Sequence, residues 1–264
     1  MMAAATTALY LSRLAINPRS RQVMSELAQP YEMHRTLMRA FPKAADEAKT
    51  KARDEFGVLF RVEVDDARGA AKVLVQSLIE PDWSFLNGLG DYLCADAEMP
   101  NPSFKDIMPA YQDLHNRQIL RFRLRANPTK RIAKQGDLMK GKRVELRRES
   151  EQIDWLMRKA QQREKGVPGG FELLMKEVKN MRGEIRMVQR VNVCPEGKQN
   201  GRKRDAAGGH VTTHLAVLFE GFLQVTDKNA FLETLVHGIG PGKAFGFGLL
   251  SVASCNVPNA VETP

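Results

Sequence analysis

The sequence predicts an α+β protein made of two successive βαββαβ units, which is a tandem ferredoxin-like (RRM-like) fold. Strand-like and helix-like segments follow one another in that order in the first half of the chain, and the order recurs in the second half. The length of 264 residues suffices for two small domains, each with its own core. We therefore expect an N-terminal domain over residues 1–128 and a C-terminal domain over residues 129–264.

The N-terminal unit begins with a strand and a helical region. Pro30 begins a new segment inside that region, because proline suits the first position of a helix. Two strands follow, then a weakly patterned stretch with a short helix, and then a strand that ends at Asn127-Pro128. The expected ranges are 9–16 for the first strand, 20–41 for the helical region, 58–64 and 73–79 for the two strands, 105–115 for the short helix and 120–126 for the last strand.

The C-terminal unit repeats this order. Its two central strands form a hairpin whose Gly- and Lys-rich tip covers residues 195–209, and Asp227 is the expected N-cap of the second helix. The expected ranges are 143–146 for the first strand, 150–164 for the first helix, 185–193 and 214–225 for the hairpin strands, 227–237 for the second helix and 249–253 for the last strand.

The formal net charge of the chain is +9, and the excess is regional. Residues 117–165 hold 16 Lys and Arg against 6 Asp and Glu, whereas the rest of the chain holds 24 against 25. Such a region favours a polyanionic partner, either a nucleic acid or an anionic membrane surface. Because no apolar run approaches the roughly 20 residues of a membrane span, we expect no membrane association and favour a nucleic acid.

The three cysteines are far apart and odd in number. This usage is typical of the reducing cytoplasm and argues against a disulfide framework or a zinc site. We therefore expect a cytoplasmic protein without a cofactor.

Within the basic region, apolar residues alternate with Arg121, Arg123 and Arg125, as in a half-buried strand. The three guanidiniums then lie on one face at intervals of roughly 6.6 Å, close to the scale of successive phosphates. Without opposing acids, such a row is costly unless an anion neutralises it. We predict that these arginines bind RNA, together with Lys130 of the same region. The alternative is a solvated linker.

A second basic cluster, Arg202, Lys203 and Arg204, lies in the hairpin tip, and Arg186 and Arg190 share one face of the preceding strand. We predict RNA contacts for all five. For the tip, a soluble loop without a ligand is an equal alternative. The Met-rich stretch 173–187 fits either a partner surface or plain core, and core is favoured.

Residues 238–248 contain five glycines and Lys243. This is not a nucleotide P-loop, because it follows a helix and Lys243 precedes Ala244 in place of Ser or Thr. Exposed backbone amides and one lysine can hold an RNA phosphate. The alternative is a tight helix-to-strand connection with Phe245 and Phe247 in the core.

Among the five histidines, His34 is the best candidate for acid–base chemistry. It lies near the start of a helical segment, where free backbone amides favour an anion, and Tyr31 three residues earlier projects on the same face. Arg35 is a candidate phosphate ligand. A packed core histidine is the alternative, because Met33 and Leu37 form the buried stripe beside it.

A metal site is not expected. His210 and His214 are four residues apart, but they lie at a loop-to-strand junction, where this spacing does not bring side chains together. With no carboxylate cluster in the sequence, we expect a reaction that is independent of metal ions.

Several segments together resemble the CasE family, the crRNA-processing subunit of the type I-E CRISPR Cascade complex. The segments are 10–13, 122–128, 151–156, 219–221 and 238–251, and they follow one another in the expected order along nearly the whole chain. The resemblance implies tandem ferredoxin-like folds, recognition of the CRISPR repeat stem-loop, and one cut at its 3′ base that leaves a 2′,3′-cyclic phosphate. It also implies that the RNA stays bound and that other Cascade subunits are partners.

The family carries Tyr-x-x-His at this place, with the histidine as the catalytic residue and the tyrosine as its helper. The resemblance therefore assigns these roles to His34 and Tyr31, and the pattern leaves open whether His34 acts as base or acid. Two other functions compete. One is a non-catalytic RNA-binding subunit on the same fold, and the other is a small-molecule enzyme on a ferredoxin-like scaffold.

Overall fold

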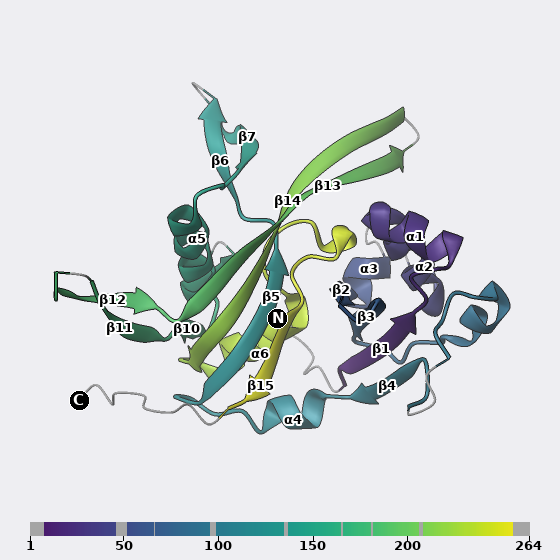
Figure 1. Cartoon of the computed structure of the whole chain (residues 1–264), viewed down its shortest axis with the longest axis horizontal. Coiled ribbons are helices and arrows are strands. Elements are labelled where there is room, and N and C mark those ends of the chain that lie inside the picture. Colours follow the sequence, from purple (N-terminus) through teal and green to yellow (C-terminus); the bar gives the residue numbers. More distant parts are fainter. Residues whose placement is uncertain are drawn as a thin grey trace.

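The computed structural model describes residues 8–45, 52–65, 67–95, 99–134, 137–164, 166–180, 182–205 and 208–255. It shows a mixed α+β protein in which two antiparallel sheets lie next to each other (Figure 1). Within the described residues, no helix has both the length and the apolar character needed to cross a bilayer.

The first sheet has the strand order β2-β3-β1-β4, and all its neighbours are antiparallel. The helices α1 and α2 bury Val23, Met33 and Leu37 against this sheet. Pro30 stands at the start of α2, as predicted. The elements are β1 (Tyr10–Ile16), α1 (Arg21–Ala28), α2 (Pro30–Leu37), η1 (Met38–Ala40), α3 (Ala52–Glu55), β2 (Leu59–Asp65), β3 (Ala70–Ser77), η2 (Ser84–Leu89) and β4 (Ser103–Asp106).

The second sheet has the order β10-β14-β5-β15, and β13 extends it as the partner of β14. The helices α5 and α6 pack Trp155, Leu156, Phe231 and Leu235 into its core. Asp227 caps α6 as predicted, with its carboxylate accepting from the Ala230 amide at 3.0 Å. The elements are β5 (Ile119–Ala126), α5 (Glu149–Gln161), β10 (Phe171–Leu173), β13 (Val191–Asp205), β14 (Gly208–Val225), α6 (Lys228–His237), η3 (Lys243–Phe245) and β15 (Leu250–Ser254).

Two elements differ from the prediction at the junction of the halves. The arginine strand β5 was expected to end the first unit, but it pairs with β14 and β15 and is the first strand of the second sheet. The first sheet is completed instead by β4, which α4 (Met108–Gln112) follows. Because β4 is short and largely exposed, it has no alternating pattern by which it could be recognised.

Three two-stranded hairpins stand outside the sheets, and they account for two more differences. The expected strand at 143–146 belongs to the first hairpin, and the expected strand at 185–193 divides at Arg190 into β12 and β13. The hairpins are β6 (Thr129–Lys134) with β7 (Asp137–Glu145), β8 (Gln162–Glu164) with β9 (Val167–Pro168), and β11 (Met175–Lys179) with β12 (Ile185–Gln189).

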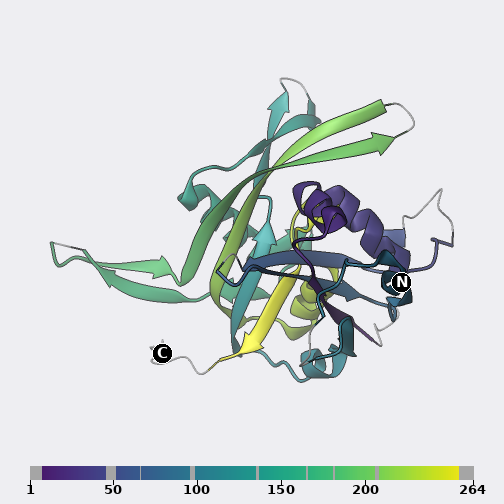
Figure 2. The ribbon, with the colours of Figure 1, turned by 45° about the vertical axis from the view of Figure 1, so that its right-hand side comes forward.

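The favoured core interpretation of the Met-rich stretch is wrong from Met175 on, because the described residues of both β11 and β12 are largely exposed. The β11–β12 hairpin projects from the body of the protein (Figures 1 and 2), and Ile185 and Met187 are 64% and 54% exposed. The tip of the predicted β13–β14 hairpin is also shorter than expected. Pairing continues from Val191 opposite Gly221 to Asp205 opposite Gly208.

Candidate active site

Tyr31 and His34 lie on one face of α2, as their spacing predicts. Their rings are parallel within 2°, with centroids 5.8 Å apart. Both side chains are half-buried. The Phe245 ring packs on Tyr31 at 5.7 Å, and the Phe60 ring lies 6.2 Å from His34. The imidazole is therefore held in a defined orientation without being enclosed in the core.

A cavity of about 480 Å³ opens on this face. It is lined by Tyr31 and His34 and by residues 242–245 of the glycine-rich loop, by which we mean residues 238–248. Lys243 lines the cavity, so the structure brings together three residues that the sequence analysis selected separately. An imidazole beside an ammonium group can exchange protons with a phosphodiester while the cation stabilises its charge.

The glycines allow the backbone of the loop to lie close to the first sheet. Gly246 has φ of +78°, and a Cβ there would lie 3.1 Å from the Phe60 ring. Phe245 and Phe247 are buried, as the alternative interpretation of the loop expected. The loop therefore serves as a packed connection and also places Lys243 in the cavity.

Two cations in the cavity wall were missed by the sequence analysis. Lys43 follows η1, and Arg53 lies on the short helix α3, where it pairs with Asp54. Neither belongs to a periodic segment or a motif, so no local signal marks them. Arg35 was predicted to bind a phosphate. In the structure its guanidinium is exposed and pairs with Glu32 at 2.9 Å.

The arginine row of β5 does face acids, so the expectation of a row without opposing carboxylates is wrong. Arg123 pairs with Glu63 at 3.2 Å and with Glu220 at 2.6 Å, and Arg125 pairs with Glu196 at 2.5 Å. Arg125 is buried, whereas Arg121 is exposed. These acids come from β2, β13 and β14, far from β5 in the sequence, and only the fold brings them together.

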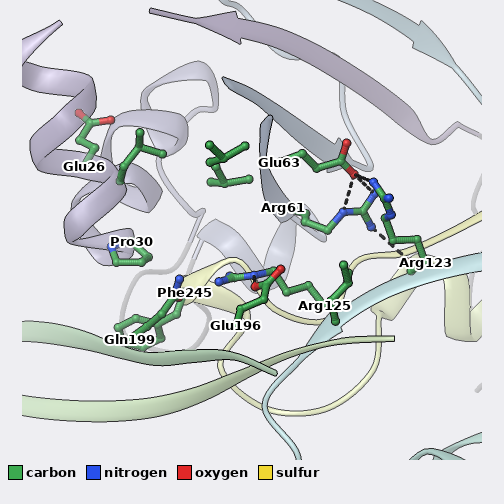
Figure 3. A pocket seen from close by; sticks show the side chains of 13 residues that line it. Glu26, Pro30, Arg61, Glu63, Arg123, Arg125, Glu196, Gln199 and Phe245 are labelled. Carbon is green, nitrogen blue, oxygen red and sulfur yellow. Dashed lines mark hydrogen bonds and ion pairs between the residues drawn. The ribbon is translucent and has the colours of Figure 1, made fainter. Parts of the chain in front are cut away.

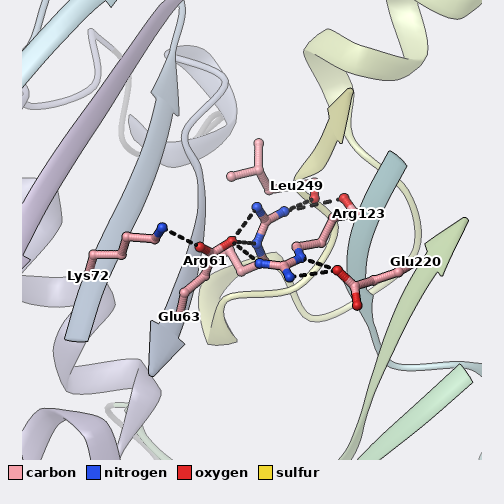
Figure 4. A network of polar contacts seen from close by, with 6 residues as sticks. All are labelled: Arg61, Glu63, Lys72, Arg123, Glu220 and Leu249. Atoms are coloured by element: carbon pink, nitrogen blue, oxygen red, sulfur yellow. Dashed lines mark hydrogen bonds and ion pairs between the residues drawn. The ribbon is translucent and has the colours of Figure 1, made fainter. Parts of the chain in front are cut away.

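Arg123 and Arg125 line a second cavity of about 530 Å³ together with Glu63 and Glu196 (Figure 3). Phe245 lines both cavities, which places the second beside the first. The charged residues of this cavity belong to a polar network that joins the first sheet to the second (Figure 4). At its centre is Arg61, which the sequence analysis missed and which is 2% exposed.

The network holds the Glu63 carboxylate in its charged form. Burial by itself would raise the pKa of Glu63, but the charge and hydrogen bonds of Arg61, with those of Lys72, outweigh burial and lower this pKa to about 2. Burial lowers the pKa of the Arg61 guanidinium from its ordinary value.

The other predicted RNA contacts lie around the second sheet. Lys130 pairs with Glu151 at 3.0 Å, Arg186 is exposed on β12, and the Arg190 guanidinium lies over the Phe222 ring at 4.5 Å. In the β13–β14 hairpin, the residues of the basic tip cluster pair with β14 through their backbone, and their side chains lie outside the described part of the chain. This cluster is Arg202, Lys203 and Arg204.

His214 lies closer to the site than its sequence position indicates. Its ring is 4.5 Å from Phe245, and its Nδ1 is 2.9 Å from the Asn127 amide nitrogen. Burial lowers the pKa of His214. Among the residues that the structure describes, no three His, Cys, Asp or Glu side chains gather as a metal site would require.

These features define an α+β protein of two antiparallel sheets with a histidine-centred site where its two halves meet. The chain belongs to the CRISPR associated protein family, whose model matches residues 9–254.

Named relatives cover almost the whole chain. The "CRISPR-associated endoribonuclease Cse3" of Thermus thermophilus is 39% identical over 246 residues, which are 93% of this chain and 100% of the relative. The "CRISPR system Cascade subunit CasE" of Escherichia coli K12 is 29% identical over 255 residues, with 93% and 99% covered. A solved structure of Cse3 bound to 19 nt RNA matches with a TM-score of 0.68 at 38% identity, covering 93% of this chain and 99% of that one. The resemblance to CasE is confirmed.

Proposed function

We propose that this chain is an endoribonuclease that binds the CRISPR repeat stem-loop, cuts the precursor crRNA once, and stays bound to the product as a Cascade subunit. One observation carries the proposal: the parallel Tyr31–His34 pair and Lys243 line the same open cavity. The names of the relatives, an endoribonuclease and a Cascade subunit, support the same function.

The proposed reaction is attack of a ribose 2′-hydroxyl on the adjacent phosphorus, which expels the 5′-oxygen and leaves a 2′,3′-cyclic phosphate. His34 exchanges a proton with one of the two oxygens, and such acid–base help contributes roughly 10²–10⁴-fold. Tyr31 keeps the imidazole oriented. Lys243 stabilises the negative charge that grows on the phosphate. In this scheme His34 makes one of the two proton transfers, solvent water makes the other, and Lys243 stabilises the charge, so the reaction needs no metal ion.

We also propose that each sheet with its helices is one ferredoxin-like domain. With β13 left out as an added strand, the strands numbered within their own units follow the order 2-3-1-4 in both sheets, which supports the repeated βαββαβ arrangement. The domain boundary that fits this pairing lies between β4 and β5, earlier than the predicted residue 128. A cytoplasmic location stays a prediction from the cysteine content.

The test is cleavage of a repeat stem-loop in EDTA. We expect a product with a cyclic phosphate end, loss of product when the scissile nucleotide is 2′-deoxy, and a decrease of about 10²-fold or more in His34→Ala. His237→Ala is the matched control, because that histidine is exposed and pairs with Glu233 on α6.

Other outcomes would identify the competing functions. Tight binding without a product would favour a non-catalytic RNA-binding subunit. No affinity for the stem-loop would favour a small-molecule enzyme. Activity that EDTA abolishes would contradict the metal-independent mechanism.

A further inference from the structure

Arg61 connects the two halves of the molecule from inside. It lies on β2 of the first sheet, where its Nε and Nη2 donate to Glu63 Oε1 at 3.0 and 2.7 Å. Its Nη1 donates to two main-chain carbonyls of the second unit, those of Arg123 at 3.3 Å and Leu249 at 3.2 Å (Figure 4). A buried guanidinium is costly unless its donors are satisfied, and these four bonds offset that cost.

The Leu249 carbonyl directly follows the glycine-rich loop, and both ends of the loop meet beside it. The Gly248 amide donates to the Arg125 carbonyl at 2.8 Å, and the Gly248 carbonyl accepts from the Ile239 amide at 2.9 Å. The bond from Arg61 to Leu249 therefore acts on the point where the loop enters β15 of the second sheet.

Two other residues of β2, Leu59 and Phe60, pack against the same loop. A Cβ at Gly238 would lie 2.8 Å from Leu59 Cδ1, and one at Gly246 would lie 3.1 Å from the Phe60 ring. Phe60 also packs near His34. One strand of the first unit thus contacts the loop and the catalytic face at once.

We propose that Arg61 is a positioning residue, which holds the glycine-rich loop so that Lys243 and Phe245 face Tyr31 and His34. Arg61 lines the neighbouring cavity and acts on the site through the main chain of the loop. The proposal rests on the proposed function for the reaction it serves.

An arginine suits this place for a geometric reason. Its planar fork donates in several directions at once, so it can bind Glu63 and both carbonyls. A lysine at this position keeps a charge for Glu63, but as a single compact ammonium it does not reproduce the fork.

The first measurement is amide hydrogen exchange of peptides from residues 238–250 in Arg61→Lys and Arg61→Met, without RNA. We expect faster exchange of these peptides, by roughly fivefold to tenfold, because one or two hydrogen bonds are lost. Arg68→Lys and Arg68→Met are the matched controls, since Arg68 lies exposed at the β2–β3 turn. They should leave the exchange unchanged.

The second measurement separates rate from affinity. At saturating protein, we expect the single-turnover cleavage rate to fall about tenfold to hundredfold in Arg61→Lys, because a small displacement of the site is expensive. The Kd for a non-cleavable 2′-deoxy stem-loop should stay within about twofold of wild type.

The proposal is overturned if Arg61→Lys keeps the wild-type rate and loop exchange, or if its rate falls while loop exchange stays unchanged. A parallel loss of rate and RNA affinity would also overturn it. If Arg61→Met unfolds, Arg61→Lys decides, because it keeps the charge pair with Glu63. Should the wild type cut no RNA, the proposed function fails, and loop exchange still tests the positioning by Arg61.

Discussion

At the scale of single residues, the charged groups of this protein divide into two kinds. Arg61 and Arg123 pair with Glu63 and Glu220 between the sheets, so these charges join the two units. Arg121, by contrast, is exposed on β5 and remains a candidate for an RNA contact. A count of basic residues does not separate the two kinds, because the pairing depends on distant carboxylates.

Glu63 leads to a prediction on acid stability. Its pKa of about 2 in the folded protein lies below the ordinary value of 4.5. A lowered carboxyl pKa contributes stability that is fully present above pH 4.5 and is lost as the pH falls towards 2. The size of this contribution is on the order of 3 kcal/mol.

We therefore expect Glu63→Gln to lower the free energy of unfolding in urea at pH 7, and the wild-type and variant curves to converge towards pH 2. The control is Glu172→Gln, because Glu172 is exposed on β10. The free energy of unfolding of this variant should follow that of the wild type at every pH. A difference between Glu63→Gln and wild type that does not change with pH would contradict the assignment.

At the scale of elements, the site depends on how a helix, a loop and a strand approach one another. The helix α2 carries the Tyr31–His34 pair, the glycine-rich loop carries Lys243, and β2 supplies the Phe60 ring between them. A substitution that changes the conformation of the loop is therefore expected to change the cleavage rate.

Gly246→Ala tests this dependence. Gly246 and Gly166 have nearly the same φ, +78° and +77°, but a Cβ at Gly166 has no atom within 4 Å. Both alanine variants should lose about 1 kcal/mol of unfolding free energy from the positive φ. Gly246→Ala should in addition slow cleavage, because its Cβ displaces the loop from Phe60. Equal cleavage rates in the two variants would refute the link between loop and site.

The arginine row of β5 gives a second prediction at this scale. Arg121→Ala should lower the slope of log Kd against log salt by about 1, because it removes one exposed phosphate contact. Arg125→Ala should mainly destabilise the fold, by about 2 kcal/mol, because it breaks a partly buried, charged hydrogen bond to Glu196.

The RNA-binding role of Arg123 and Arg125 stays a prediction, and the same salt titrations test it. A decrease in slope for Arg125→Ala as large as that for Arg121→Ala would show that the RNA displaces Glu196. An unchanged slope in Arg121→Ala, Arg123→Ala and Arg125→Ala would remove the β5 row from the RNA interface.

At the scale of the whole molecule, the two units share one site. The first provides the Tyr31–His34 pair and the second provides the loop and the long β13–β14 hairpin. An RNA that contacts both units is held over a large area, so we expect its release to be slower than its cleavage.

This expectation is measurable as a burst. With RNA in excess, the product formed should equal the protein concentration and then stop, because the cut stem-loop stays bound. Raising the salt concentration should release the product, since phosphate contacts weaken with salt. Multiple turnovers at low salt would contradict the proposed retention.

Local patterns in the sequence determined the features that are themselves local. The alternation of residues 120–126 predicted a strand, Pro30 and Asp227 predicted helix starts, and the Tyr31–His34 spacing predicted a shared face. The approximate order of elements and the family resemblance followed from the same patterns.

The tertiary structure decided which strands pair and which charges meet. It moved β5 to the second sheet, completed the first with β4, and placed Glu63 and Glu196 against the arginine row. It also set Arg61 against the carbonyl of Leu249. The physical reason is range: periodicity reports only how a segment divides its faces between core and solvent. The partner across a sheet or a salt bridge is chosen by packing between residues that are distant in the chain.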